Sequence, residues 1–123
     1  MARHPLVSVV DDDESVRESL PDLLRLLGYT VHAFASAEEF LASIYVDRTK
    51  CLILDIAMPG MSGPDLQSEL KLRRKAIPIV FITGVRDKMV RPRVLEQGAM
   101  ECLFKPFSDT ELLKALNTAL GVR

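Results

Sequence analysis

Five polar side chains in this sequence stand directly after short apolar runs, where each run gives way to a loop. They are Asp11, Asp12, Asp55, Thr83 and Lys105. The carboxyl ends of strands in an open parallel sheet face one crevice, so residues far apart in the chain can converge there. Three carboxylates, a hydroxyl and an ammonium group in one place would bind a divalent cation and accept a phosphoryl group.

The elements that would position these residues follow from the hydrophobic pattern. Apolar runs predict strands near 6–10, 30–34, 51–54, 78–82 and 101–104. Amphipathic stretches predict helices near 14–27, 36–44, 64–74, 89–97 and 108–119. Five βα units result, and the central strands are apolar throughout. This pattern is typical of a parallel sheet with helices on both faces, so we expect an α/β fold of the three-layer αβα sandwich type.

Local signals refine the ends of the predicted helices. Pro92 falls inside the fourth predicted helix, and proline is well tolerated at a first helical position. We therefore expect the ordered helix to begin at Pro92 and residues 85–91 to form a loop beside the crevice. Left-handed glycines are expected just past three helices, at Gly28, Gly98 and Gly121.

Length and composition exclude several classes of protein. The chain has 123 residues, 48% of them hydrophobic, which suits one compact domain spanning residues 1–123. Lys and Arg number 16 against 17 Asp and Glu, so no overall field favours nucleic acid, and we expect no direct nucleic-acid binding. No run approaches the roughly 20 apolar residues of a membrane span, and the first residues lack a signal-peptide pattern.

The two cysteines lie inside predicted strands. Cys51 and Cys102 are not spaced like metal ligands or a redox pair, so we expect both to be buried thiols. Unpaired thiols persist in a reducing compartment, which favours a cytoplasmic location.

The motifs, taken together in their order and spacing, resemble the response-regulator receiver domain of bacterial two-component phosphorelays, the CheY-like superfamily. The resemblance covers nearly the whole chain and rests on Asp11-Asp12, residues 55–63, Thr83-Gly84 and residues 105–107. Residues 36–41 and Gly98-Ala99 are most similar to FixJ-type receivers, which commonly precede a helix-turn-helix DNA-binding domain. The resemblance implies a flavodoxin-like (βα)5 fold with a five-stranded parallel sheet of order 2-1-3-4-5.

The resemblance also implies a metal site and a phosphoacceptor. Asp55 corresponds to the phosphorylated aspartate, and it would attack phosphorus in line to give an acyl phosphate. Two carboxylates ~4 Å apart repel each other by roughly 4 kcal/mol at an effective dielectric of 20, so a divalent cation is needed. Mg²⁺ or Mn²⁺ would bind Asp12, Asp55 and the backbone carbonyl of Ala57, with Asp11 acting mostly through water.

Two further residues correspond to catalytic groups of the family. Lys105 would contact a phosphoryl oxygen or Asp55, and Thr83 would donate a hydrogen bond to another phosphoryl oxygen. In receivers the peptide bond corresponding to Lys105–Pro106 is usually cis, and we expect the same here. Such a domain is not an enzyme that turns over an external substrate, but it catalyses its own phosphorylation and dephosphorylation.

The resemblance predicts partners as well. The phosphoryl donor would be the phosphohistidine of a sensor histidine kinase or a phosphotransfer protein. Phosphorylation would switch a partner-binding surface at about residues 85–119 and favour a homodimer through the fourth helix, fifth strand and fifth helix. The output would be control of transcription through a domain that this chain lacks. The alternative is a stand-alone receiver that shuttles phosphate or binds partner proteins.

One position departs from the family pattern. Cys102 stands where many receivers carry an aromatic residue that turns inward on phosphorylation. A cysteine lacks the volume and the rotamer change of Tyr or Phe. We therefore expect the signal to pass mainly through Thr83 and residues 85–91.

Other function classes share parts of this pattern. A flavodoxin-like electron carrier would need a first loop that cradles an FMN phosphate, and the acidic run 11–13 would repel it. An aspartate-nucleophile phosphatase typically carries its nucleophile after the first strand with a second Asp two residues on, whereas Ala57 stands two residues after Asp55. A degenerate receiver that only binds partners would not need the complete set of polar residues.

Overall fold

The computed structural model describes residues 5–84 and 87–121. Its strands are β1 (Leu6–Val10), β2 (Thr30–Phe34), β3 (Cys51–Asp55), β4 (Ile79–Thr83) and β5 (Glu101–Phe104). Its α-helices are α1 (Glu14–Leu26), α2 (Ala37–Leu41), α3 (Gly63–Leu72), α4 (Val90–Glu96) and α5 (Asp109–Leu120). A short 3-10 helix, η1, spans Val46–Arg48. Each predicted strand is present within one residue at either end.

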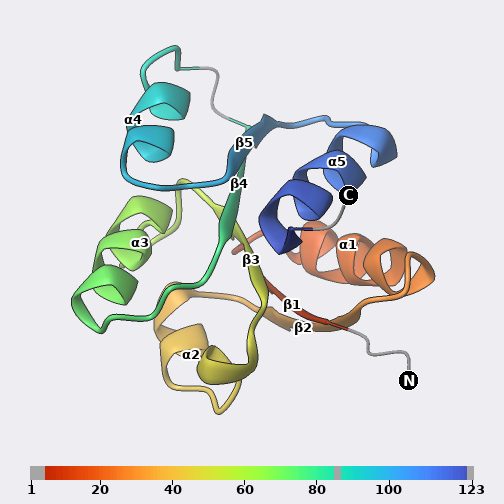
Figure 1. Cartoon of the computed structure of the whole chain (residues 1–123), viewed down its shortest axis with the longest axis horizontal. Helices are drawn as coiled ribbons and strands as arrows, with labels where there is room; N and C mark the ends of the chain where they lie inside the picture. Colours follow the sequence, from red (N-terminus) through yellow and green to blue (C-terminus); the bar gives the residue numbers. More distant parts are fainter. Residues whose placement is uncertain (1–4, 85–86, 122–123) are drawn as a thin grey trace.

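The five strands form one parallel sheet of order β2-β1-β3-β4-β5 (Figure 1). The register pairs Val10 with both Phe34 and Leu54, so β1 ends level with its two neighbours. Asp55 pairs with Ile82 across β3 and β4, which places Asp55 and Thr83 at the same edge. The predicted α/β fold and strand order are confirmed.

Helices cover both faces of the sheet, and each face has its own hydrophobic core (Figure 1). α1 and α5 lie on one side, and α2, α3 and α4 lie on the other. Side chains alternate along β3, so Cys51 and Ile53 join the first core while Leu52 and Leu54 join the second. All four side chains are fully buried, which explains why this strand is apolar without interruption.

Side-chain caps start four of the helices. Asp13 caps α1 by accepting a hydrogen bond from the Ser15 backbone N–H, and Ser36 caps α2 in the same way from Glu39. Ser62 begins α3 in a reciprocal capping box with Asp65, and Ser108 begins α5 in a box with Glu111. The predicted left-handed glycines are confirmed at Gly28 (φ 100°), Gly98 (φ 105°) and Gly121 (φ 69°).

The predicted start of the fourth helix is wrong. α4 begins at Val90, and Pro92 is its third residue. The first N–H groups of a helix have no intrahelical partner, so proline is tolerated anywhere in the first turn. Asp87 prepares this start, because its side chain accepts the Met89 N–H and its carbonyl accepts the Val90 N–H. The predicted loop thus ends before Val90, and residues 85–86 lie outside the described part of the chain.

The second helix is shorter than predicted. It spans five residues, and a turn through η1 then leads to β3, where the pattern predicted helix as far as residue 44. The Thr49 hydroxyl stabilises this turn by donating to the Tyr45 carbonyl and pairing with the Ser8 hydroxyl at 2.7 Å. Both cysteines are buried free thiols, as expected.

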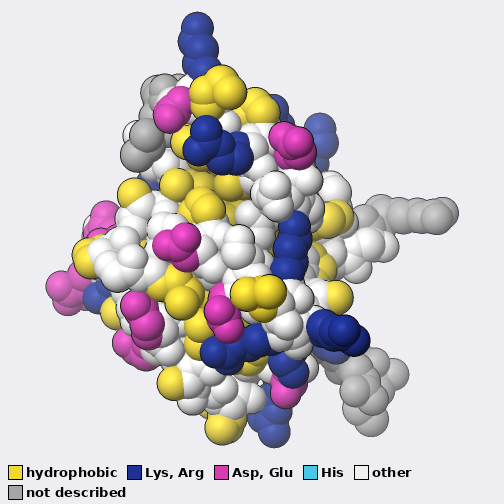
Figure 2. Space-filling model, turned by 90° about the vertical axis from the view of Figure 1, so that its left-hand side faces the viewer, with side chains coloured by type: hydrophobic (Ala, Val, Ile, Leu, Met, Phe, Trp, Pro, Cys, Tyr) yellow, Lys and Arg dark blue, Asp and Glu magenta, His cyan; other side chains and the backbone are white. Residues whose placement is uncertain are grey.

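The surface carries charges of both signs. Figure 2 shows the face that α2, α3 and α4 form, where Lys and Arg side chains occur together with Asp and Glu side chains around exposed hydrophobic ones. This mixture agrees with the near-zero net charge. Within the described ranges, the helices are too short or too polar to cross a lipid bilayer.

Candidate functional site

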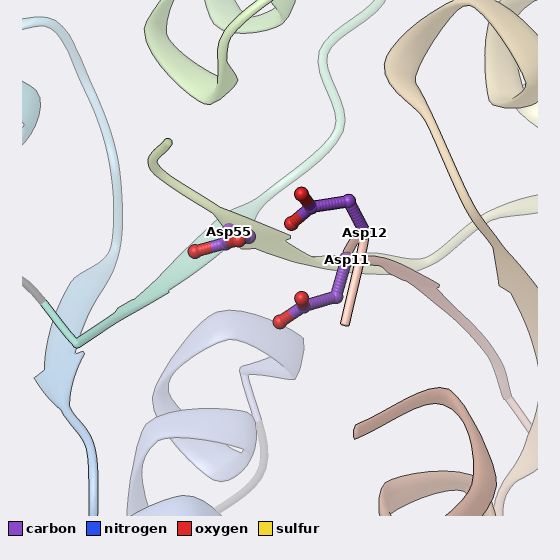
Figure 3. A group of neighbouring side chains, drawn as sticks. All are labelled: Asp11, Asp12 and Asp55. Atoms are coloured by element: carbon purple, nitrogen blue, oxygen red, sulfur yellow. The ribbon is translucent and has the colours of Figure 1, made fainter. Parts of the chain in front are cut away.

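Three carboxylates gather at the carboxyl edge of the sheet. Asp11 and Asp12 follow the end of β1, and Asp55 is the last residue of β3. One oxygen from each lies within 4.8 Å of the others (Figure 3). The side chains of Asp11 and Asp55 are buried, at 0% and 7% exposure, while Asp12 is exposed. The structure therefore brings together the three acidic residues that the sequence singled out.

Asp11 is held on both of its carboxylate oxygens. Oδ1 accepts the Asp13 backbone N–H at 2.9 Å, and Oδ2 accepts a hydrogen bond from the Lys105 ammonium group at 3.0 Å. The Asp11 backbone carbonyl accepts a hydrogen bond from Arg17 at 2.9 Å. Both oxygens of Asp11 already have protein partners, whereas Asp12 is exposed to solvent.

Asp55 has an abnormal affinity for protons. Burial raises the pKa of Asp55 from 3.8 to about 7, and repulsion from Asp11 and Asp12 adds to the shift. The Lys105 ammonium group acts in the opposite direction. The cluster thus has an excess of negative charge that one lysine does not neutralise, and a cation beside Asp55 would lower this pKa.

Thr83, the last residue of β4, and Lys105, directly after β5, lie at the same edge of the sheet. The Lys105 backbone N–H donates to the Thr83 carbonyl at 2.8 Å, which extends the ladder between the two strands. The predicted cis peptide bond between Lys105 and Pro106 is confirmed. The lysine pairs with Asp11, whereas the sequence had suggested Asp55 as its carboxylate partner. Thr83 is 1% exposed at the end of β4.

The loop after Asp55 turns back sharply into α3. The Gly63 N–H donates to the Ile56 carbonyl at 2.9 Å. A Cβ at Gly63 would overlap the Asp55 carbonyl oxygen and lie 2.9 Å from the Phe81 ring, so only glycine fits this close approach. Ala57, the expected backbone ligand, lies in this loop two residues after Asp55 and is exposed.

Sequence reasoning missed two contacts of the site. Arg17 holds the carbonyl of Asp11, and Glu38 accepts a hydrogen bond from the Met61 backbone N–H at 3.1 Å. Arg17 could have been suspected because it lies in the first turns of the helix that follows the acidic pair. No local signal indicates the second contact, which joins residues 23 positions apart.

The arrangement fits a hard divalent cation. Carboxylate oxygens are the ligands that such ions prefer. Three of them lie within 4.8 Å of one another, close enough to bind the same ion. Burial, and after it repulsion from Asp11, raises the pKa of Asp55, and a bound cation would oppose both effects. The ammonium group of Lys105 beside this cluster adds a fixed positive charge where an anionic group could bind.

Comparisons with known proteins agree with this geometry. A family model described as the response regulator receiver domain matches residues 7–117. Nodulation protein W of Bradyrhizobium diazoefficiens is 48% identical over 114 residues, covering 93% of this chain and 50% of that protein. The transcriptional regulatory protein FixJ of Azorhizobium caulinodans is 39% identical over 116 residues, covering 94% of this chain and 54% of that protein.

A solved structure supports the same assignment. The structure of the response regulator StyR superposes with a TM-score of 0.89 at 45% identity, covering 97% of this chain and 60% of that chain. This chain belongs to the response regulator receiver domain family. The likeness to FixJ-type receivers is confirmed as well. The chain spans about half the length of the curated relatives it matches.

Proposed function

We propose that this receiver domain accepts a phosphoryl group on Asp55 from the phosphohistidine of a sensor histidine kinase or a phosphotransfer protein. The observation that carries the proposal is the cluster of three carboxylates at the ends of β1 and β3, with Lys105 beside it. Asp55 is the last residue of β3, so its backbone is held within the sheet. A rigid nucleophile is what in-line attack on phosphorus requires.

The same residues would hold a divalent cation, Mg²⁺ or Mn²⁺. Asp12 and Asp55 would be direct ligands, together with the backbone carbonyl of Ala57, and Asp11 would act mostly through water because its oxygens already bind Lys105 and Asp13. When bound, the ion neutralises charge on Asp55 and on the incoming phosphoryl group. Ionisation of Asp55 is then favoured at neutral pH.

The chemistry at Asp55 is a single displacement. A carboxylate oxygen of Asp55 forms a bond to phosphorus while the phosphorus–nitrogen bond of the donor breaks, and the imidazole leaves with the electron pair and takes up a proton. Lys105 is within reach of a phosphoryl oxygen, and the Thr83 hydroxyl stabilises another. Hydrolysis of the acyl phosphate by water returns Asp55. The domain therefore catalyses its own phosphorylation and dephosphorylation and does not turn over a separate substrate.

The output of phosphorylation would be a change in the surface formed by α4, β5 and α5, at about residues 85–119. This surface would bind a partner or a second phosphorylated copy. Cys102 is buried under it and has no aromatic ring to turn inward, so the change would pass from Thr83 through the start of α4. Relatives of about twice this length include a transcriptional regulatory protein, which supports control of transcription as the downstream effect.

Labelling with a small phosphodonor tests the proposal. Purified protein is incubated with acetyl phosphate and Mg²⁺, and the mass of the intact protein is followed over time. We expect one phosphoryl group on the wild type, none on Asp55→Asn, and unchanged labelling on Asp47→Asn, which removes an exposed carboxylate remote from the site. Equal labelling of the wild type and Asp55→Asn would refute Asp55 as the acceptor.

A further inference from the structure

One segment that the family resemblance singled out touches the site only through the Glu38 contact, and that contact has been given no function so far. Residues 36–41 form the cap and the whole of α2. Ala37 and Phe40 are fully buried and pack in the core, which accounts for two of these positions. Glu38 is exposed, so packing does not account for it.

Glu38 contacts the tip of the loop that follows Asp55. Its Oε2 accepts the Met61 backbone N–H at 3.1 Å. The same oxygen lies against Gly60, where an added Cβ would be only 2.7 Å from it. Gly60 has φ 75°, a left-handed conformation that glycine adopts without strain. The Glu38 carboxylate therefore contacts two consecutive residues at the tip of the loop.

The rest of this loop is fixed at its base and in its middle. The Gly63 N–H closes the base on the Ile56 carbonyl, and the Met58 side chain is 8% exposed within the second core. Ala57 lies between these two anchors, and its carbonyl is the proposed backbone ligand. The hydrogen bond from the Met61 N–H to Glu38 is an additional contact, and it joins the loop to α2.

We infer that Glu38 is a positioning residue for the cation site: its carboxylate holds the loop 56–62 so that the Ala57 carbonyl stays available beside Asp55. The inference rests on the proposed function, because it assigns Ala57 to the ion. A tether of this kind acts through the position of the hydrogen-bond acceptor. It differs from simple attraction between a negative charge and a cation, which any carboxylate on α2 would supply.

Three substitutions at Glu38 separate these two explanations. Glu38→Ala removes both the acceptor and the charge. Glu38→Gln keeps an acceptor oxygen at the same length and removes the charge. Glu38→Asp keeps the charge and shortens the reach by one methylene. The matched control is Glu39→Gln, which removes the charge of the next residue of the same helix, also exposed.

Two measurements report on the tether. Isothermal titration calorimetry gives the Mg²⁺ dissociation constant, and hydrogen exchange gives the protection of the Met61 amide without any metal. A hydrogen bond from an N–H to a carboxylate contributes only a modest free energy at an exposed site. We therefore expect roughly three- to tenfold weaker Mg²⁺ binding for Glu38→Ala and Glu38→Asp. Glu38→Gln and Glu39→Gln should stay within about twofold of the wild type. Exchange of the Met61 amide should be faster in Glu38→Ala and Glu38→Asp alone.

Any result other than these expected ones overturns the inference. If Glu38→Gln binds Mg²⁺ as weakly as Glu38→Ala, charge and not the acceptor matters. If all variants bind like the wild type, or if the Met61 amide exchanges at an unchanged rate, the contact does not hold the loop. Absence of Mg²⁺ uptake by the wild type would overturn the proposed cation site itself, and with it the tether. The last result is distinct from the others, because they all require a wild type that binds the ion.

Discussion

The raised pKa of Asp55 predicts how the stability of the metal-free protein depends on pH. Asp55 holds its proton with a pKa of about 7 in the fold, compared with 3.8 for an ordinary aspartate. Protonation therefore stabilises the folded state more than the unfolded chain. This contribution is complete below about pH 4 and is lost as the pH rises through about 7. In the absence of divalent ions, raising the pH should weaken the fold.

The size of the effect follows from the same shift. A change from 3.8 to about 7 corresponds to about 4 kcal/mol at 1.36 kcal/mol per pKa unit. Asp12 is exposed to solvent, which screens part of the charge, so we expect about 2 kcal/mol over the whole shift. Asp55→Asn has the same shape and no titrating group. Its free energy of unfolding, relative to the wild type, should rise by about 2 kcal/mol between about pH 4 and about pH 8.

Urea unfolding followed by circular dichroism measures this difference. Both proteins are unfolded in EDTA at a series of pH values, so that other titrating groups cancel in the comparison. Saturating Mg²⁺ at about pH 8 should then stabilise the wild type more than Asp55→Asn, because the ion binds the ionised carboxylate. Parallel pH profiles for the two proteins would refute the argument that Asp55 carries unfavourable charge in the fold.

Five further substitutions test three separate parts of the structure. Lys105→Ala removes the ammonium partner of a fully buried aspartate and should cost about 2 kcal/mol in urea unfolding, with a smaller loss in saturating Mg²⁺. An equal loss with and without the ion would contradict this. Gly121→Ala should cost about 1 kcal/mol for its left-handed backbone, and Gly60→Ala about 1 kcal/mol more, because its Cβ displaces a carboxylate from its hydrogen bond. Equal costs would show that the second effect is absent. Leu66→Ala should lower the free energy of unfolding by about 2–5 kcal/mol, and Leu72→Ala, 79% exposed in the same helix, should leave it nearly unchanged.

Proline positions show where local reasoning about a helix succeeds and where it fails. Pro92 correctly indicated the first turn of a helix but did not indicate its first residue. None of the first positions of a helix needs an N–H donor, so a proline fits any of them. Its presence therefore does not tell which of these positions it occupies. The start at Val90 depends instead on the Asp87 side chain and carbonyl, which form the turn before the helix.

The sequence by itself determined the five strands, the alternation with helices and the polar residues at the strand ends. These features depend on neighbours in the chain: apolar runs form buried strands, and serine, aspartate and glycine start or end helices through contacts within one turn. The acidic set was recognisable because each member follows such a run. That these residues converge at one edge could be predicted from the general geometry of parallel sheets.

The tertiary structure decided the contacts that no local pattern encodes. Lys105 pairs with Asp11 across 94 residues, and Glu38 reaches Met61 across 23. The raised pKa of Asp55 likewise depends on burial and on charges brought in by another strand. Such effects depend on the distance between atoms in the folded chain, and that distance is set by the order of the strands and the packing of the helices, not by separation along the sequence.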